Sequence, residues 1–253
     1  MSRPASPARA IAAMTAMELR LVLRRGENLF ATIVIPTLVL VLFSSISILP
    51  TGTGRPVDFL LPGSIALGII ATSLVSLGIT TAYDRSYGVL KRLGGSPLSR
   101  AELIVARLLT VLVVEAVQIA LLVGTATVAL GWTVGPSGGS PILLALAVVL
   151  GTVAFAGIGL LLAGTLRAET VLAVANVLFL GFLVVGGVIV PIDQLPGPLP
   201  AVAAALPAAP LSDVLRTALG TAAAGTDMGS SVALLTAWAA VASGLAAATF
   251  RWE

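Results

Sequence analysis

Few residues of this chain could carry chemistry, and their types exclude most catalytic mechanisms. The sequence contains no histidine and no cysteine, which rules out disulfides, Cys/His metal sites and every nucleophile–histidine arrangement. The one lysine, Lys91, follows Leu90, so there is no G-x-x-x-x-G-K-[ST] loop and the chain cannot be a P-loop ATPase by itself. The paired aspartates expected of lipid-head-group transferases are absent as well. We therefore predict a chain that is not an enzyme and that holds no metal and no other cofactor.

The longest charged stretch lies between residues 83 and 107. Within it, the apolar residues Val89, Leu90 and Leu93 alternate with the cations Lys91 and Arg92, which predicts a short amphipathic helix. Two interpretations of this pattern are open. The stretch is either a solvated loop whose positive charge reflects membrane topology alone, or a docking element for a partner protein.

The same stretch contains signals for the end of one helix and the start of the next. Gly94 and Gly95 end the short helix, and a Ser-Pro pair then breaks the chain. Ser99 can cap the following helix, and Glu102, three residues later, completes a capping box.

Composition indicates that the remaining elements lie in a membrane. Of the 253 residues, 58% are hydrophobic and 10% are charged, whereas about 25% of the residues of a soluble domain are charged. A helix needs about 20 apolar residues to cross a bilayer core of about 30 Å. The net charge of +3 comes from basic residues that flank apolar segments, so membrane topology explains it and we predict no nucleic-acid partner.

The apolar stretches predict an all-α membrane protein with six transmembrane helices. These spans form one domain, 29–253, and lie at about 29–49, 59–82, 103–130, 141–166, 170–190 and 230–250. Segment 83–102 connects the second and third spans. Segment 191–229 holds six prolines around an apolar stretch too short to span. It predicts short re-entrant helices on the extracellular side.

Residues 1–28 predict a cytoplasmic tail and an interfacial helix before the first span. Met14, Met17 and Leu21 recur at helical spacing, which is typical of an amphipathic helix that lies on a membrane. Three cations close by are expected to face anionic lipid head groups: Arg20, Arg24 and Arg25.

The distribution of cations predicts the orientation of the chain. With both termini in the cytoplasm, twelve of the fourteen Lys and Arg residues lie inside: Arg3, Arg9, Arg20, Arg24, Arg25, Arg85, Lys91, Arg92, Arg100, Arg107, Arg167 and Arg251. Only Arg55 and Arg216 lie outside, so this orientation obeys the positive-inside rule and its reverse violates it. Thirteen of the fourteen cations are Arg and Ala, Gly and Val are abundant. We take this composition to indicate a bacterial protein of the cytoplasmic membrane.

Three residues with a carboxyl or amide side chain stand inside the predicted spans. Glu115 lies near the middle of the third span, Gln118 follows three residues later, and Asn176 lies in the fifth span. A carboxyl group at this depth is costly, so Glu115 faces a partner or water. Two interpretations stay open: these residues line a substrate path in which Glu115 binds a cationic drug, or Glu115, protonated or paired, forms a hydrogen bond between helices.

The charged stretch resembles a loop of the ABC-2 type permeases, the membrane subunits of ATP-binding-cassette exporters. The resemblance rests on Asp84-Arg85-x-x-Gly88-Val89-Leu90-Lys91-Arg92-Leu93 followed by Ser96-Pro97-Leu98. It extends to Pro62-Gly63 in the second span and to the prolines before the last span, and is greatest for the daunorubicin and multidrug-resistance type. Ser86 is a departure, because the family often has a second acidic residue there.

The resemblance implies that the loop is a coupling helix that docks on a separate ATPase subunit. The residues that would contact or position this partner are Asp84, Arg85, Gly88, Leu90, Lys91, Arg92, Leu93 and Pro97. Leu90 and Leu93 would fit an apolar socket, and the charged residues would hold it by charge-assisted bonds. It also implies two ATPase copies that bind ATP and Mg, a second permease subunit, identical or paralogous, and export of an amphipathic drug, lipid or lipid-linked metabolite.

Two other classes of function remain as alternatives. An ion-coupled secondary transporter would have two inverted repeats and helices broken at mid-membrane, and the sequence has no such internal symmetry. A membrane-embedded enzyme lacks the required His, Cys and acidic clusters.

Overall fold

The computed structural model describes residues 6–24, 26–46, 54–94, 99–222 and 226–250, which form helices and connecting turns without a strand. Five helical stretches are long and apolar enough to cross a membrane: Pro56–Ser86, Arg100–Leu130, Pro141–Thr165, Ala168–Val185 and Met228–Thr249. In α2, Gly26–Ile46, the apolar stretch Thr32–Ser45 is shorter than these. The all-helical, multi-pass fold is confirmed, and the count of six spans stays a prediction.

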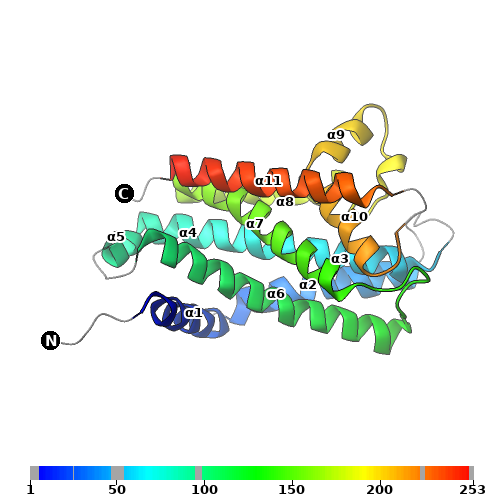
Figure 1. The fold of residues 1–253 in the computed structure, drawn as a ribbon, viewed down its shortest axis with the longest axis horizontal. Helices are drawn as coiled ribbons and strands as arrows, with labels where there is room; N and C mark the ends of the chain where they lie inside the picture. The colour runs from blue at the N-terminus through cyan, green and yellow to red at the C-terminus, as the bar shows by residue number, and fades with distance from the viewer. Residues whose placement is uncertain (1–5, 25, 47–53, 95–98, 223–225, 251–253) are drawn as a thin grey trace.

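The long helices lie side by side along the longest dimension of the molecule (Figure 1). The first long span consists of α3, Pro56–Ile69, a π-helical segment η1, Ile70–Ser76, and α4, Leu77–Ser86. Next come α5, Val89–Gly94, α6, Arg100–Leu130, α7, Pro141–Thr165, and α8, Ala168–Val185. The last span is α11, Met228–Thr249. The Pro56–Ser86 span is the most buried of the five, so it forms the centre of the bundle.

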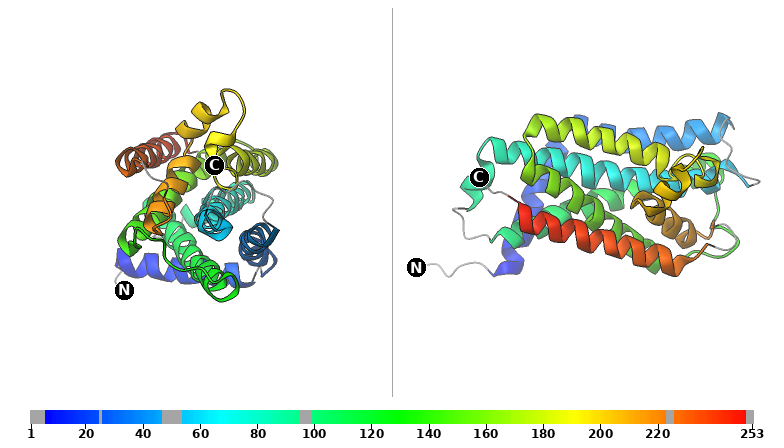
Figure 2. Two further views of the ribbon diagram at one scale, coloured as in Figure 1. Left: turned by 90° about the vertical axis from the view of Figure 1, so that its right-hand side faces the viewer. Right: turned by 90° about the horizontal axis from the view of Figure 1, so that it is seen from above.

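Helix α1, Pro7–Arg24, runs across one end of the bundle. Figure 2 shows it side-on in the view in which the long helices are seen end-on. The short helix α5 and the C-terminal end of α11 lie at the same end (Figure 1). The described ends of the chain thus lie on one side of the bundle, and the cytoplasmic placement of both termini stays a prediction.

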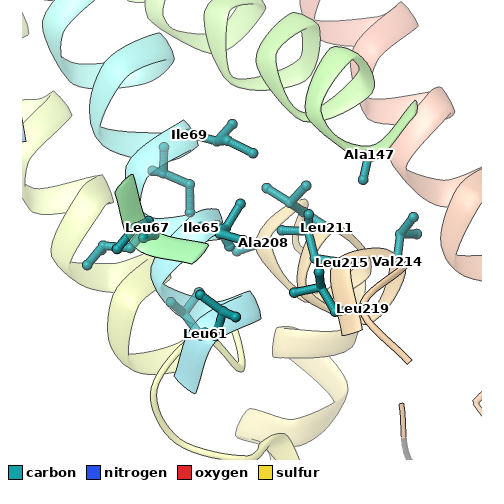
Figure 3. Packing of buried hydrophobic residues seen from close by; sticks show 14 of the residues in the cluster. Leu61, Ile65, Leu67, Ile69, Ala147, Ala208, Leu211, Val214, Leu215 and Leu219 are labelled. Atoms are coloured by element: carbon teal, nitrogen blue, oxygen red, sulfur yellow. The ribbon is translucent and has the colours of Figure 1, made fainter. Parts of the chain in front are cut away.

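The opposite end of the bundle is closed by the proline-rich region. It contains a 3₁₀ turn, η2, Ile192–Gln194, and two short helices, α9, Leu199–Ala205, and α10, Ala208–Ala218. Figure 3 shows Ala208, Leu211 and Leu215 of α10 pointing toward Leu61 and Ile65 of α3. All five side chains are buried, so α10 is an integral part of the core.

The fifth span ends five residues earlier than its predicted limit of 190, at Val185. Gly187 adopts a φ of 68°, a left-handed conformation that ends the helical path. Its carbonyl accepts a hydrogen bond of 2.6 Å from Arg216 Nη2. Residues 186–190 therefore belong to the region that packs against α10, not to the span.

Both cations that the charge distribution places outside have structural partners. The guanidinium of Arg55 donates to the carbonyls of Leu130 and Gly131 at 2.6 and 3.0 Å, so it caps the C-terminus of α6. Arg216 lies 4.2 Å from the centre of the Phe59 ring in addition to its bond to Gly187. Arg55 thus stabilises the end of α6, and Arg216 stabilises the segment that follows α8.

Glycines allow α7 to lie against the central span. A Cβ on Gly159 of α7 would lie 2.8 Å from the Leu74 carbonyl oxygen and 3.1 Å from that of Ser73, both in η1. A Cβ on Gly78 of α4 would meet Gly159 at 3.1 Å. The two backbones are in contact, and a side chain at either glycine would separate them.

We predict that Gly159→Ala lowers the free energy of unfolding by about 1–3 kcal/mol, because backbone atoms of η1 cannot yield as a side chain does. Gly124→Ala in α6 is the matched control, since a Cβ there meets nothing within 4 Å. It should leave stability unchanged or raise it, because alanine favours helix. Thermal unfolding in detergent measures both variants, and equal melting temperatures would contradict the close approach.

Candidate functional site

A buried ionic cluster joins three helices at the end of the bundle that carries α1 and α5. Arg107 of α6 is only 5% exposed. Its Nη1 donates to Thr81 Oγ1 at 2.7 Å, its Nη2 pairs with the carboxylate of Asp84 in α4, and its Nε lies 3.5 Å from Glu18 Oε1 in α1. We call Glu18, Asp84 and Arg107 the ionic cluster. It fixes the interfacial helix to the central span and to α6.

Sequence reasoning treated Arg107 only as a cation that reports topology. A signal was nevertheless present, because Arg107 lies about two turns inside a helix that starts after the Ser99 cap. A cation this deep needs a specific partner. The capping box itself is confirmed: Ser99 N donates to Glu102 Oε2 at 2.6 Å, and Glu102 N donates to Ser99 Oγ at 3.3 Å.

Arg85 binds within its own chain as well. One of its terminal nitrogens donates to the carbonyl of Leu166 at the C-terminal end of α7. Because the last carbonyls of a helix have no partner in the helix, a guanidinium there both satisfies an acceptor and interacts favourably with the helix dipole. The adjacent residues Asp84 and Arg85 therefore connect α4 to two other helices, Asp84 to α6 and Arg85 to α7.

The short helix α5 presents one face to its own protein and one to solvent. Gly88 has a φ of 69°, which permits the sharp turn from α4. Leu90 is 2% exposed and packs with Met14 of α1 and with Leu103 and Ala106 of α6, and Leu93 is half-buried beside it. Lys91 and Arg92 are exposed.

This arrangement differs from the expectation that Leu90 inserts into a socket on a partner. A six-residue amphipathic helix has one apolar face, and the structure uses that face to fasten α5 to α1 and α6. Among the described residues of this segment, those left exposed for a partner are Ser86, Tyr87, Lys91 and Arg92. The ring of Tyr87 is 71% exposed and stacks on Tyr83 at 5.9 Å. Pro97 lies outside the described residues.

Of the cations predicted to face lipid head groups, Arg20 and Arg24 are exposed on α1. Arg25 lies outside the described residues. Met14 of α1 is 5% exposed and packs with Leu90, whereas Met17 and Leu21 are 43% and 40% exposed.

Glu115 and Gln118 are buried and connect helices. Thr152 Oγ1 of α7 lies 2.5 Å from Glu115 Oε2 and 2.7 Å from the carbonyl oxygen of Val148. A hydroxyl has one proton and a carbonyl only accepts. Both contacts are satisfied together when the Glu115 carboxyl is protonated and donates to Thr152, which donates to Val148. Gln118 Nε2 donates to Thr32 O of α2 at 2.7 Å.

Asn176 has a different environment from Glu115 and Gln118. It is exposed on α8, and its Nδ2 donates to the carbonyl of Leu172 at 2.7 Å. It borders a groove of about 400 Å³ between α2, η1 and α8, together with Pro36, Ala71 and Phe179. Of the three polar residues predicted to line a substrate path, only Asn176 borders this groove.

The fold is that of a multi-pass membrane protein, and sequence comparison identifies its family. The ABC-2 type transporter family model matches residues 9–219. This chain belongs to the ABC-2 type transporter family. The match covers α1, the ionic cluster and the segment around α5. No curated protein matches the chain. Membership makes the chain a transport subunit and not itself an enzyme, and it implies association with an ABC ATPase.

We predict that Arg107→Met destabilises the protein by about 3 kcal/mol, because it removes the guanidinium that the partly buried carboxylates of Asp84 and Glu18 face. Arg20→Met removes an exposed cation and is expected to change stability by less than about 0.5 kcal/mol. Chemical unfolding of the two variants in detergent is the measurement. A loss that is as small for Arg107 as for Arg20 would show that the cluster is not structural.

Proposed function

We propose that this chain is the permease of an ATP-driven exporter in a bacterial cytoplasmic membrane. Six spans with both termini in the cytoplasm place α1 and α5 on the cytoplasmic side, where an ATPase is accessible. Two ATPase copies supply ATP and Mg, and a second permease subunit, identical or paralogous, completes the transport path. The transported compound is an amphipathic drug, lipid or lipid-linked metabolite, as in the multidrug-resistance type.

The observation that carries this proposal is the dual attachment of α5. Its apolar residue Leu90 is held by α1 and α6, and Gly88 joins it directly to α4. Asp84 and Arg85, just before that turn, are bound to α6 and α7. A force applied to the exposed side of α5 is therefore transmitted to the central span and to two of its neighbours.

The proposal assigns separate roles to the charged residues. Lys91 and Arg92, which are exposed, contact an acidic surface of the ATPase. Asp84, Arg85 and Leu90 hold the coupling segment in place and do not need to touch the partner. Substitution of Leu90 by a charged residue would unfold this segment, so it would not distinguish docking from folding.

We predict that the double variant Lys91→Glu/Arg92→Glu lowers co-purification of the ATPase from the native host by about tenfold or more, since like charges at an interface repel. Both residues are exposed, so the thermal stability of the variant should be unchanged. Arg9→Glu/Arg20→Glu, with equal charge change on the exposed face of α1, is the control and should retain the ATPase. Retention of the ATPase by the Lys91/Arg92 variant at the wild-type level would refute docking through α5.

The substrate path follows the groove that Asn176 borders, and Glu115 and Gln118 stabilise helix contacts beside it. Asn176→Leu removes a polar group from the groove without filling the core. We predict that it slows efflux of a fluorescent cationic dye about fivefold, the equivalent of one lost hydrogen bond. Glu115→Gln keeps a hydrogen-bonding partner for Thr152 and should leave efflux unchanged. The reverse result, with slow efflux only in Glu115→Gln, would assign the path to Glu115.

A further inference from the structure

A cavity beside the ionic cluster lies against the groove at Asn176. The cavity has a volume of about 190 Å³, and Thr32, Ser76 and Thr80 line it and the groove alike. Ser76 is the last residue of η1, and Thr80 lies one turn later in α4, so both belong to the central span. A ligand held at these residues is therefore within reach of both spaces.

The shared residues continue a polar face of the central span. Ser76, Thr80 and Asp84 recur every four residues and all line the cavity. Residues at this spacing lie on the same face of a helix. The polar face thus runs from the π-helical segment, where the groove is, to the ionic cluster at the end of the bundle.

The hydroxyl groups of Ser76 and Thr80 are available to a ligand. Thr72, which also lines the cavity, donates its hydroxyl proton to the carbonyl of Gly68 at 2.8 Å. Within the described part of the chain, the hydroxyls of Ser76 and Thr80 form no hydrogen bond, and their oxygens are accessible to solvent. Each of the two hydroxyls can therefore donate one hydrogen bond and accept others.

These two hydroxyls select a ligand by hydrogen bonding and not by charge. Among the described residues that line the groove, none is Asp, Glu, Lys or Arg. In the cavity, Arg107 and Asp84 are paired with each other at the far end of the polar face. A hydroxyl group on the ligand matches this pair, because it both donates and accepts hydrogen bonds.

The groove provides space for the apolar body of such a ligand. Its volume is about 400 Å³, and Ala71, Val75 and Phe179 are among its lining residues. Ile35 of α2 and Leu172 of α8 also line it and are 51% and 44% exposed, so the groove opens to the outer surface of the bundle. An alkyl chain or ring system can extend between α2 and α8 into the lipid phase.

We propose that Ser76 and Thr80 bind the hydroxyl-bearing polar group of an amphiphile whose apolar body lies in the groove at Asn176. The polar group exchanges hydrogen bonds with both side chains, and the body lies along Ala71 and Phe179. Since the groove is the proposed substrate path, the inference rests on the proposed function, and the pair recognises the polar group of the transported compound.

The first test is the reactivity of introduced thiols in the purified full-length chain in phosphatidylcholine nanodiscs. The chain contains no cysteine, so each variant carries one thiol. Ser76→Cys and Thr80→Cys should react with N-ethylmaleimide. Ser73→Cys is the matched control and should not react, because Ser73 lies in the same π-helical segment, is 0% exposed and lines neither the cavity nor the groove.

The second test measures protection of Ala71→Cys, a reporter thiol in the groove, by 1-O-dodecylglycerol. This diol should slow labelling in a saturable manner, and its dimethyl ether, which cannot donate a hydrogen bond, should not. With Ser76→Ala/Thr80→Val in the reporter chain, the half-protecting concentration should rise about tenfold, the effect of two lost neutral hydrogen bonds. Ser73→Ala in the same chain removes a hydroxyl away from the groove and should leave that concentration unchanged.

Nanodiscs of phosphatidylglycerol, whose head group carries hydroxyls, distinguish two sources of the ligand. Protection of the reporter by this lipid alone identifies a bilayer lipid, and protection by 1-O-dodecylglycerol alone identifies a free compound. Equal reactivity of Ser73→Cys and Ser76→Cys, equal protection by the dimethyl ether, or an unchanged half-protecting concentration in Ser76→Ala/Thr80→Val would each overturn the proposal. Labelling needs no ATPase, so a failure to bind the ATPase or to export dye would refute the proposed function and not this binding site.

Discussion

The buried charge of Arg107 is the constraint on which the arrangement of the end of the bundle that carries α1 and α5 depends. A guanidinium two turns inside a spanning helix is stable only with anionic and hydrogen-bonding partners around it. These partners come from α1 and α4, so satisfying one charge fixes three helices relative to one another. Leu90 packs between α1 and α6, and this contact fixes the position of α5. The ionic cluster thus holds α1, α4, α5 and α6 together at this end of the bundle.

Elements determined by local sequence could be predicted from the sequence, and contacts between distant segments could not. The apolar spans and the Ser99–Glu102 capping box depend on neighbouring residues, and both are present. The partner of Arg107 in α1 is far away in the chain, and Arg85 binds a backbone carbonyl, which no side-chain pattern reveals. The alternation around Leu90 predicted an amphipathic helix but could not distinguish an intramolecular contact from an intermolecular one.

For the polar residues of the spans as well, the sequence identifies which residues are unusual, and the structure is needed to find their contacts. Sequence identifies Glu115, Gln118 and Asn176 as unusual because a polar group in a membrane is costly. Geometry is needed to separate them, since Glu115 and Gln118 connect helices and Asn176 borders a groove. Composition likewise identified Arg55 and Arg216 only as exceptions to a charge count, whereas Arg55 caps the end of α6 and Arg216 binds the carbonyl of Gly187 beyond the end of α8.

The π-helical segment η1 has a consequence for the direction of the residues beyond it. Hydrogen bonds in Ile70–Ser76 reach one residue farther than in an α-helix, and each added residue turns the following face by about 100°. The direction in which Asp84 and Arg85 point is therefore determined by η1, deep within the bundle. This direction places Asp84 beside α6 and Arg85 beside α7. A single helical wheel drawn from Pro56 to Ser86 would assign these two residues to the wrong faces.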